Sequence, residues 1–183
     1  MANIHEDVER ILVTEDELRE INRRLGAQIT EDFKGKKLFI VGILKGSIYF
    51  MTDLTRNIDL PLEIDFLGVS SYGSSTRSSG QVRILKDLDK SIEGYDVLLI
   101  EDILDTGRTL SYVSEMLMNR KANSISICTL LDKPERRAPD VNIVPKYVGC
   151  DVPNEFVVGY GLDYDQKYRN LPYIGVLKRA IYE

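Results

Sequence analysis

Ten consecutive residues, Glu101 to Leu110, combine side chains and a turn that suit phosphate and sugar chemistry. They follow the apolar run 97–100, where a buried strand is expected to end, and they precede a helical pattern. Unpaired backbone N–H groups at the start of a helix attract anions, and Gly107 allows the backbone to approach a ligand closely. The side chains that can add hydrogen bonds or charge are Thr106, Arg108 and Thr109. This segment therefore predicts a phosphate-binding turn.

Three acids in the same segment, Glu101, Asp102 and Asp105, would repel a bare phosphate. They are therefore expected to bind sugar hydroxyls, hold Mg²⁺ or move a proton. A purely structural interpretation is an acidic loop that closes an ordinary strand-to-helix unit, and an acid pair alone would favour it. The order of apolar strand, two acids, two apolar residues, Asp-Thr-Gly and a second threonine favours a functional site.

This order of residues resembles the phosphoribosyl-pyrophosphate (PRPP) motif of type I phosphoribosyltransferases. The resemblance implies that Glu101 and Asp102 hydrogen-bond the ribose 2′- and 3′-hydroxyls, and that the turn after Asp105 wraps the 5′-phosphate. It extends from about residue 44 to residue 169 and is specific enough to indicate the hypoxanthine-guanine branch. Arg108 stands where relatives often have lysine, which keeps the positive charge.

Lys45-Gly46 follows the apolar run 38–44, at a strand end where ligands bind in open α/β sheets. The pair is common after strands and is weak evidence by itself. The resemblance implies that its backbone binds pyrophosphate and that the peptide bond before Lys45 is cis. It also implies that Arg169 contacts pyrophosphate, since a guanidinium suits such oxygens, and that Asp163 holds Mg²⁺ through water.

Lys133 follows the expected strand 124–131 and would alone be interpreted as a surface lysine. The resemblance implies that it donates to the purine O6 atom, which hypoxanthine and guanine share and adenine lacks. An ammonium is only a donor, so it would find no acceptor on the adenine amino group. Phe156 and Val157 would ordinarily be core residues; the resemblance implies that Phe156 stacks on the purine and that the Val157 carbonyl meets its edge.

Asp105 is the expected catalytic base, and Glu101, Asp102 and Asp163 are the expected metal-binding acids. The residues expected to bind substrate are Lys45, Gly46, Ser71, Tyr72, Glu101, Asp102, Ile103, Leu104, Asp105, Thr106, Gly107, Arg108, Thr109, Lys133, Phe156, Val157, Asp163 and Arg169.

Residues 70–80 contain six serines and two glycines, a composition that buries little apolar surface. One interpretation is a solvated hairpin loop. The other is a lid that closes over the ligand and excludes water. The resemblance favours the lid, because purine phosphoribosyltransferases carry a long loop with a Ser-Tyr pair here, matched by Ser71-Tyr72.

Hydrophobic spacing predicts strands alternating with helices. Thr14 and Glu17 have the spacing of a capping box, and apolar residues at steps of three and four continue that helix to Phe33. A second helix is expected over 47–56, and a third has the apolar face Leu110, Val113 and Leu117. The expected strands are 38–44, 63–69, 97–100, 124–131, 146–150 and 156–160. The pattern predicts an α/β fold, a mostly parallel twisted sheet flanked by helices, in a single domain over 1–183; the resemblance adds a small hood formed by terminal segments.

The composition limits the classes of function. Hydrophobic content of 43%, charged content of 29% and a length of 183 residues suit one globular domain. A net charge of −5 argues against a broad nucleic-acid-binding surface. No apolar run approaches the ~20 residues that span a bilayer, and the acidic residues 1–7 lack a signal-peptide core. Cys128 and Cys150 are expected to be buried free thiols in a reducing cytoplasm.

The resemblance implies a purine-salvage enzyme that transfers the 5-phosphoribosyl group from PRPP to hypoxanthine or guanine. The products would be IMP or GMP and pyrophosphate, the cofactor Mg²⁺, and the assembly a homodimer or homotetramer. One alternative is a nucleotide-sensing regulator that binds RNA or DNA. A local patch for RNA could be residues 133–137, which contain three basic residues. Another is an enzyme acting on xanthine or a pyrimidine. A single histidine, His5, makes histidine-based catalysis unexpected.

Overall fold

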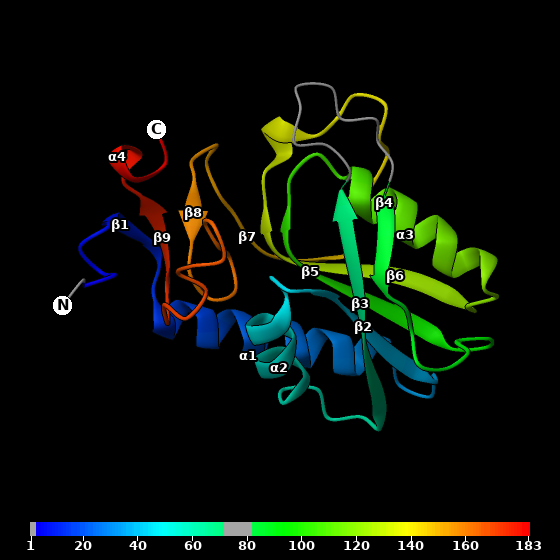
Figure 1. The fold of residues 1–183 in the computed structure, drawn as a ribbon. Coiled ribbons are helices and arrows are strands. Elements are labelled where there is room, and N and C mark those ends of the chain that lie inside the picture. Colours follow the sequence, from blue (N-terminus) through cyan, green and yellow to red (C-terminus); the bar gives the residue numbers. More distant parts are fainter. Residues whose placement is uncertain (1–2, 72–81) are drawn as a thin grey trace.

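A mostly parallel six-stranded sheet forms the centre of the molecule (Figure 1). The computed structural model describes residues 3–71 and 82–183. The strand order is β4-β3-β2-β5-β6-β7, and only the β3–β4 pair is antiparallel. The strands are β2 (Leu38–Leu44), β3 (Leu62–Ser71), β4 (Val82–Lys86), β5 (Asp96–Leu104), β6 (Ser124–Asp132) and β7 (Tyr147–Asp151). The predicted fold class is confirmed, while β4 was not expected from the sequence.

The three longer helices are α1 (Glu15–Asp32), α2 (Ile48–Thr55) and α3 (Arg108–Asn119). The capping box at the start of α1 is present: Thr14 Oγ1 accepts from the Glu17 backbone N–H at 3.3 Å, and Glu17 Oε2 accepts from the Thr14 N–H at 2.7 Å. Both bonds satisfy donors that a helix start leaves without partners. The buried face of α3 consists of Leu110, Val113 and Leu117, as predicted.

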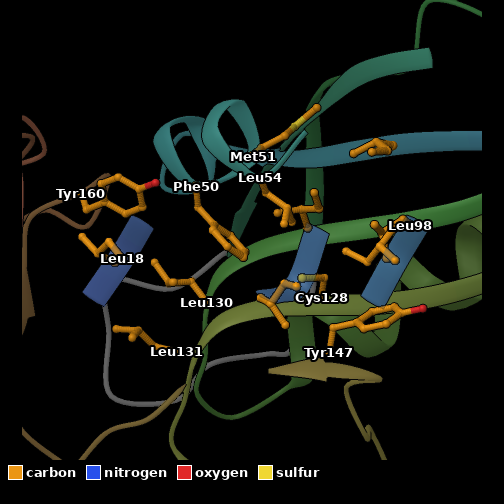
Figure 2. Packing of buried hydrophobic residues seen from close by; sticks show 14 of the residues in the cluster. Leu18, Phe50, Met51, Leu54, Leu98, Cys128, Leu130, Leu131, Tyr147 and Tyr160 are labelled. Carbon is orange, nitrogen blue, oxygen red and sulfur yellow. The ribbon is translucent and has the colours of Figure 1, made fainter. Parts of the chain in front are cut away.

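Successive residues of β2 and β5 face opposite sides of the sheet, so each side has its own core. Ile40, Leu98 and Ile100 pack in the cluster that includes α1 and α2. Val41 and Leu99 pack in the cluster that includes the apolar face of α3. Figure 2 shows the first cluster, where Phe50 and Leu54 of α2 point toward side chains of β5 and β6. The labelled residues are Leu18, Phe50, Met51, Leu54, Leu98, Cys128, Leu130, Leu131, Tyr147 and Tyr160.

A small antiparallel sheet, which we call the hood, joins segments from both ends of the sequence. Its strands are β1 (Val8–Val13), β8 (Val157–Val158) and β9 (Ile174–Leu177), in the order β1-β9-β8. The N- and C-terminal segments meet there, at the left of Figure 1, and the short helix α4 (Arg179–Tyr182) follows β9. The hood is confirmed, although β1 and β9 were not predicted as strands.

Two predicted strand boundaries are wrong. The strand expected over 156–160 is reduced to Val157–Val158, because Gly159 and Tyr160 have φ angles of 102° and 49°, outside the extended region. β5 does not end at residue 100 but continues through the acids to Leu104. Its final residues pair with β6 but not with β2, whose pairing ends at Ile100, so the acids lie beside only one strand.

Cys128 is a buried free thiol, as expected, whereas Cys150 is partly exposed and corrects that expectation. In the described part of the chain, no helix has both the length and the apolar character needed to cross a membrane.

Ser71 is the last residue of β3. Its predicted partner Tyr72, and the proposed lid over 72–80, fall outside the described residues.

Candidate active site

The predicted site segments meet at the carboxyl edge of the large sheet. β2, β5 and β6 are neighbours and run parallel. Lys45 follows β2, Asp105 follows β5, and Lys133 follows β6. The Lys133 N–H donates to the Leu104 carbonyl at 3.0 Å, which joins the last two strand ends. Parallel pairing therefore assembles groups that are up to 88 residues apart in the sequence, at the edge where ligands bind in such sheets.

The Lys45-Gly46 loop lies against both the acid pair and the hood. The peptide bond between Leu44 and Lys45 is cis, as the family resemblance implied. A Cβ atom on Gly46 would lie 1.6 Å from Asp102 Oδ2, and one on Gly161 would lie 1.9 Å from the Gly46 carbonyl oxygen. A side chain at position 161 would push against the Gly46 backbone, and one at position 46 would displace the Asp102 carboxylate, so glycine at both positions preserves these close approaches.

Glu101 and Asp102 form a partly buried acid pair. The Ile103 N–H donates to Asp102 Oδ1 at 2.7 Å, and the Asp102 N–H donates to Glu101 Oε1 at 3.3 Å. Burial, together with the neighbouring Asp102 charge, raises the pKa of Glu101 well above its usual range; burial also raises the pKa of Asp102. The pair is thus under electrostatic strain that a bound cation or hydroxyl donors would relieve.

The expected phosphate turn forms the start of α3. Gly107 caps the helix with φ 80°, and a Cβ there would meet the Val141 side chain at 3.0 Å. Thr106 and Thr109 are partly exposed beside it. The Arg108 guanidinium donates to both carboxylate oxygens of Asp140, at 2.8 and 3.0 Å. In this structure Arg108 therefore directs its charge to Asp140.

Asp105 is held by two arginines, to which the family resemblance gave no role. Arg136 Nε donates to Asp105 Oδ1 at 3.0 Å, and Arg137 donates to the Asp105 backbone carbonyl at 2.9 Å. Arg137 also donates to Asp132 Oδ1 at 2.6 Å, and both of these side chains are largely buried. Lys133 is buried as well. The three cations of the suggested RNA-binding patch are therefore engaged within the protein.

A cavity of about 390 Å³ lies between the end of β5 and the hood. It is lined by Ile103, Asp105, Lys133, Arg136, Asn154, Glu155, Phe156, Val157 and Leu162. Lys133 Nζ donates to the Glu155 carbonyl at 2.7 Å. Burial lowers the pKa of the Lys133 ammonium, although the nearby Asp105 charge opposes this shift. The cavity therefore offers a cation, a carboxylate and apolar walls, a combination that suits a flat heterocycle with polar edges.

Phe156 and Val157 form the hood side of this cavity. Val157 is buried and pairs with Val176 of β9, so its position is fixed by the sheet. Phe156 is 38% exposed, and its ring stacks on Tyr182 with a centroid distance of 4.8 Å. Tyr164 packs edge-on against the same ring at 5.7 Å. A ring held by two aromatic neighbours forms a rigid wall for a second stacked ring.

Asp163 and Arg169 form an ion pair at 2.7 Å near the Lys45 loop. The Arg169 guanidinium donates to the Gly161 carbonyl at 2.6 Å, and Lys45 Nζ donates to Gln166 Oε1 at 3.0 Å. The Gln166 N–H in turn donates to Asp163 Oδ2 at 2.9 Å. This network links the loop after β2 to the segment after β8.

The structure thus brings most of the predicted residues to one edge of the sheet, in two groups. One group surrounds the cavity and contains Asp105, Lys133, Phe156 and Val157. The other consists of the acid pair, the Lys45-Gly46 loop and the Asp163–Arg169 pair. Sequence reasoning placed Arg136 and Arg137 only in the alternative RNA-binding patch and gave Gln166 no role, because their contacts with the site join loops that are distant in the sequence. Within 3–71 and 82–183, no three acidic, histidine or cysteine side chains form a complete metal-binding group.

The fold and the site together define the class of this protein. The model of the family described as phosphoribosyl transferase domain matches residues 9–165. The chain belongs to this family.

Among its relatives, the hypoxanthine-guanine phosphoribosyltransferase of Staphylococcus aureus (strain Mu50) is 56% identical over 179 residues, which cover 98% of this chain and 99% of the relative. The bifunctional protein TilS/HprT of Listeria monocytogenes is also 56% identical over 98% of this chain, but the chain spans only 28% of that relative's length.

Solved structures agree with the sequence relatives. A crystal structure of a hypoxanthine phosphoribosyltransferase from S. aureus matches with a TM-score of 0.95 at 56% identity, covering 98% of this chain and 97% of the other. A hypoxanthine-guanine phosphoribosyltransferase from Bacillus anthracis, with HEPES in its active site, matches with a TM-score of 0.88 at 43% identity, covering 93% of this chain and 99% of the other.

Proposed function

We propose that this protein is a purine-salvage enzyme, a glycosyltransferase that joins hypoxanthine or guanine to PRPP and releases IMP or GMP and pyrophosphate. The observation that carries the proposal is the cavity at the carboxyl edge of the sheet, which unites Asp105, Lys133 and Phe156 beside the turn at Gly107. The family match and the similarity to proteins named hypoxanthine-guanine phosphoribosyltransferase support it.

In the proposed reaction the purine N9 atom forms a bond to ribose C1′. The bond between C1′ and the pyrophosphate oxygen breaks, and pyrophosphate leaves with that electron pair. The proton displaced from the purine ring, handled at N7, passes to the Asp105 carboxylate as general base. Proton transfer of this kind contributes roughly 10²–10⁴-fold to the rate.

The ribose and its phosphates would occupy the second group of residues. Glu101 and Asp102 accept hydrogen bonds from the ribose hydroxyls, and the N–H groups at the start of α3 bind the 5′-phosphate. The backbone of the Lys45-Gly46 loop, with Arg169, holds the leaving pyrophosphate. The developing negative charge is stabilised there by donors that the fold has already oriented.

The acid pair also fits Mg²⁺. Two partly buried carboxylates with raised pKa values have little cationic compensation of their own, and Mg²⁺ is commonly held by one or two carboxylates, substrate phosphates and water. We expect Glu101, Asp102 and Asp163 to hold it. When bound, the ion would supply positive charge at the phosphate oxygens of PRPP.

Base selection is assigned to Lys133. Its ammonium already donates to one carbonyl, that of Glu155, and retains further donors for the purine O6 atom. Phe156 supplies the stacking surface and the Val157 carbonyl can accept from the guanine 2-amino group. A regulator that binds RNA is a weaker candidate, because the cations at 133–137 are engaged internally.

The proposal extends to assembly and location. A homodimer or homotetramer would cover apolar side chains that α2, β3 and β4 leave exposed, such as Tyr49, Ile64 and Leu85; light scattering would give the number of chains. Free thiols at Cys128 and Cys150 suit a reducing cytoplasm, and cell fractionation would test this location.

The decisive experiment is nucleotide formation from PRPP and Mg²⁺ with hypoxanthine, guanine, xanthine, adenine or uracil. We expect turnover of hypoxanthine and guanine, with adenine and uracil inert. Folded protein that binds PRPP but converts none of the five bases would contradict the proposal and favour a nucleotide-sensing regulator.

A further inference from the structure

Arg136 lines the same cavity as Asp105, yet the family resemblance gave it no role. It ends the short 3-10 helix Pro134–Arg136, which follows Lys133 directly. Its Nε atom donates to Asp105 Oδ1 at 3.0 Å. The two side chains are 47% and 40% exposed, so this contact lies at the mouth of the cavity and is not part of the core.

The two carboxylate oxygens of Asp105 have different surroundings. Oδ1 accepts the hydrogen bond from Arg136, whereas no residue of 3–71 or 82–183 donates to Oδ2. Arg137 bonds only the backbone carbonyl of Asp105, so it fixes the turn and leaves the carboxylate free to rotate. Within the described chain, the orientation of the carboxylate therefore depends on Arg136.

We infer that Arg136 is a positioning residue, which holds Asp105 through Oδ1 so that Oδ2 receives the purine proton. The inference rests on the proposed function and deepens it. A general base must lie within hydrogen-bond reach of its proton, and a third group commonly orients it. The purine N–H bond breaks, its electron pair stays on the ring, and the proton bonds to Oδ2. The guanidinium remains protonated throughout and only orients the base.

The test measures single-turnover nucleotide formation, with the enzyme in excess over the purine base and the PRPP concentration varied. It compares wild type with Arg136→Leu, Arg136→Lys, Asp105→Asn and the double variant Arg136→Leu/Asp105→Asn. We expect Arg136→Leu to slow the step by roughly 10- to 100-fold, since small errors in the placement of a reacting group have such effects. The KM for PRPP should stay unchanged, and Arg136→Lys should recover part of the rate. In the Asp105→Asn background, loss of Arg136 should add nothing.

Arg23→Leu is the matched control, because it removes another exposed arginine-carboxylate pair, that with Glu20 on α1. It should react at the wild-type rate. A normal rate for Arg136→Leu, a raised KM for PRPP, or a further loss in the double variant would each overturn the positioning role. If wild type itself made no nucleotide, the proposed function would fail, and the inference with it.

Discussion

Asp105 is the residue on which the chemistry of the proposed reaction depends. Asp105→Asn keeps the shape of the side chain and one acceptor oxygen for Arg136 but replaces the other oxygen with an NH2 group, which cannot accept the purine proton. We expect kcat to fall by roughly 10²–10⁴-fold with PRPP affinity little changed, as measured by turnover and by calorimetric titration of PRPP. A variant with near-normal kcat would remove Asp105 from the role of base.

Lys133 should decide which bases the cavity accepts. Lys133→Gln replaces a charged donor with an amide that can also accept. A hydrogen bond to a charged group is worth about 1.5–3 kcal/mol, so kcat/KM for hypoxanthine and guanine should fall by roughly 10- to 100-fold. Competition assays with adenine would measure the selectivity. Unchanged discrimination between hypoxanthine and adenine would count against this assignment.

Sequence alone predicted the site residues that belong to a local motif. The segment from Glu101 to Thr109 could be predicted as a site because its residues form a consecutive motif. Lys45-Gly46 could be predicted only through the family resemblance. Arg136 and Gln166 could not be found in this way, because each acts through a contact between loops separated by at least 31 residues. The partner of Arg108 was missed for the same reason, since Asp140 lies 32 residues away.

At the scale of single elements, the capping box of α1 gives a direct test of local structure. Thr14→Ala removes the acceptor of the Glu17 N–H and should lower the free energy of unfolding by about 1 kcal/mol. Urea denaturation would measure the loss. Thr52→Ala is the control, because its hydroxyl only donates to the Ile48 carbonyl within α2 and caps no helix. Equal losses in the two variants would contradict a specific capping effect.

Asp65 joins β3 to the connection that follows β4, and this contact should depend on pH. Its carboxylate is buried and accepts from the Phe66 and Asp89 N–H groups, both at 2.7 Å, and from Lys86 Nζ at 3.0 Å. Burial opposes ionisation, but these bonds outweigh it and lower the pKa of Asp65 in the folded state. The stabilisation that the ionised Asp65 side chain provides is therefore fully present above its pKa in the unfolded chain, about 3.9. It is lost as pH falls through the lower pKa of Asp65 in the folded protein.

We expect Asp65→Asn to be less stable than wild type by roughly 1–3 kcal/mol at pH 7. The difference should shrink when both proteins are unfolded by urea at pH values below about 4. A difference that stays constant from neutral to acidic pH would show that the ionised form of Asp65 contributes nothing.

Elements with strong periodicity were predictable, and elements that depend on distant partners were not. The helix after Thr14 and the apolar strands at residues 38 and 124 follow from local patterns. β1 and β9 show no such pattern and form strands because they pair with each other across the whole sequence. β5 continues past residue 100 because β6 still pairs with it. The residues around the acids do not reveal this pairing, because β6 lies further along the sequence.

For the molecule as a whole, we propose that residues 1–183 fold as one domain. The hood residues Val13, Val157 and Ile174 belong to the same core cluster as Leu98 and Leu130 of the large sheet. Thermal unfolding should therefore give one transition, with equal calorimetric and van't Hoff enthalpies. Two separable transitions would instead assign the hood to an independent unit.

Ile174→Ala tests this coupling, since the side chain is fully buried in the central hood strand. We expect it to cost roughly 2–5 kcal/mol and to lower the midpoint of the entire transition, as followed by tyrosine circular dichroism. Melting of the hood alone, with the large sheet unchanged, would contradict a single cooperative core.

The strand order of the hood also has a consequence for synthesis on the ribosome. β9 lies between β1 and β8, although it is translated after both and after every strand of the large sheet. A growing chain can pair β2, β3, β5 and β6 as they emerge, but β1 and β8 must wait for the strand that joins them. The cavity wall that carries Phe156 and Val157 is therefore assembled after the sheet edge, so a nascent chain forms the turn at Gly107 before it completes the cavity.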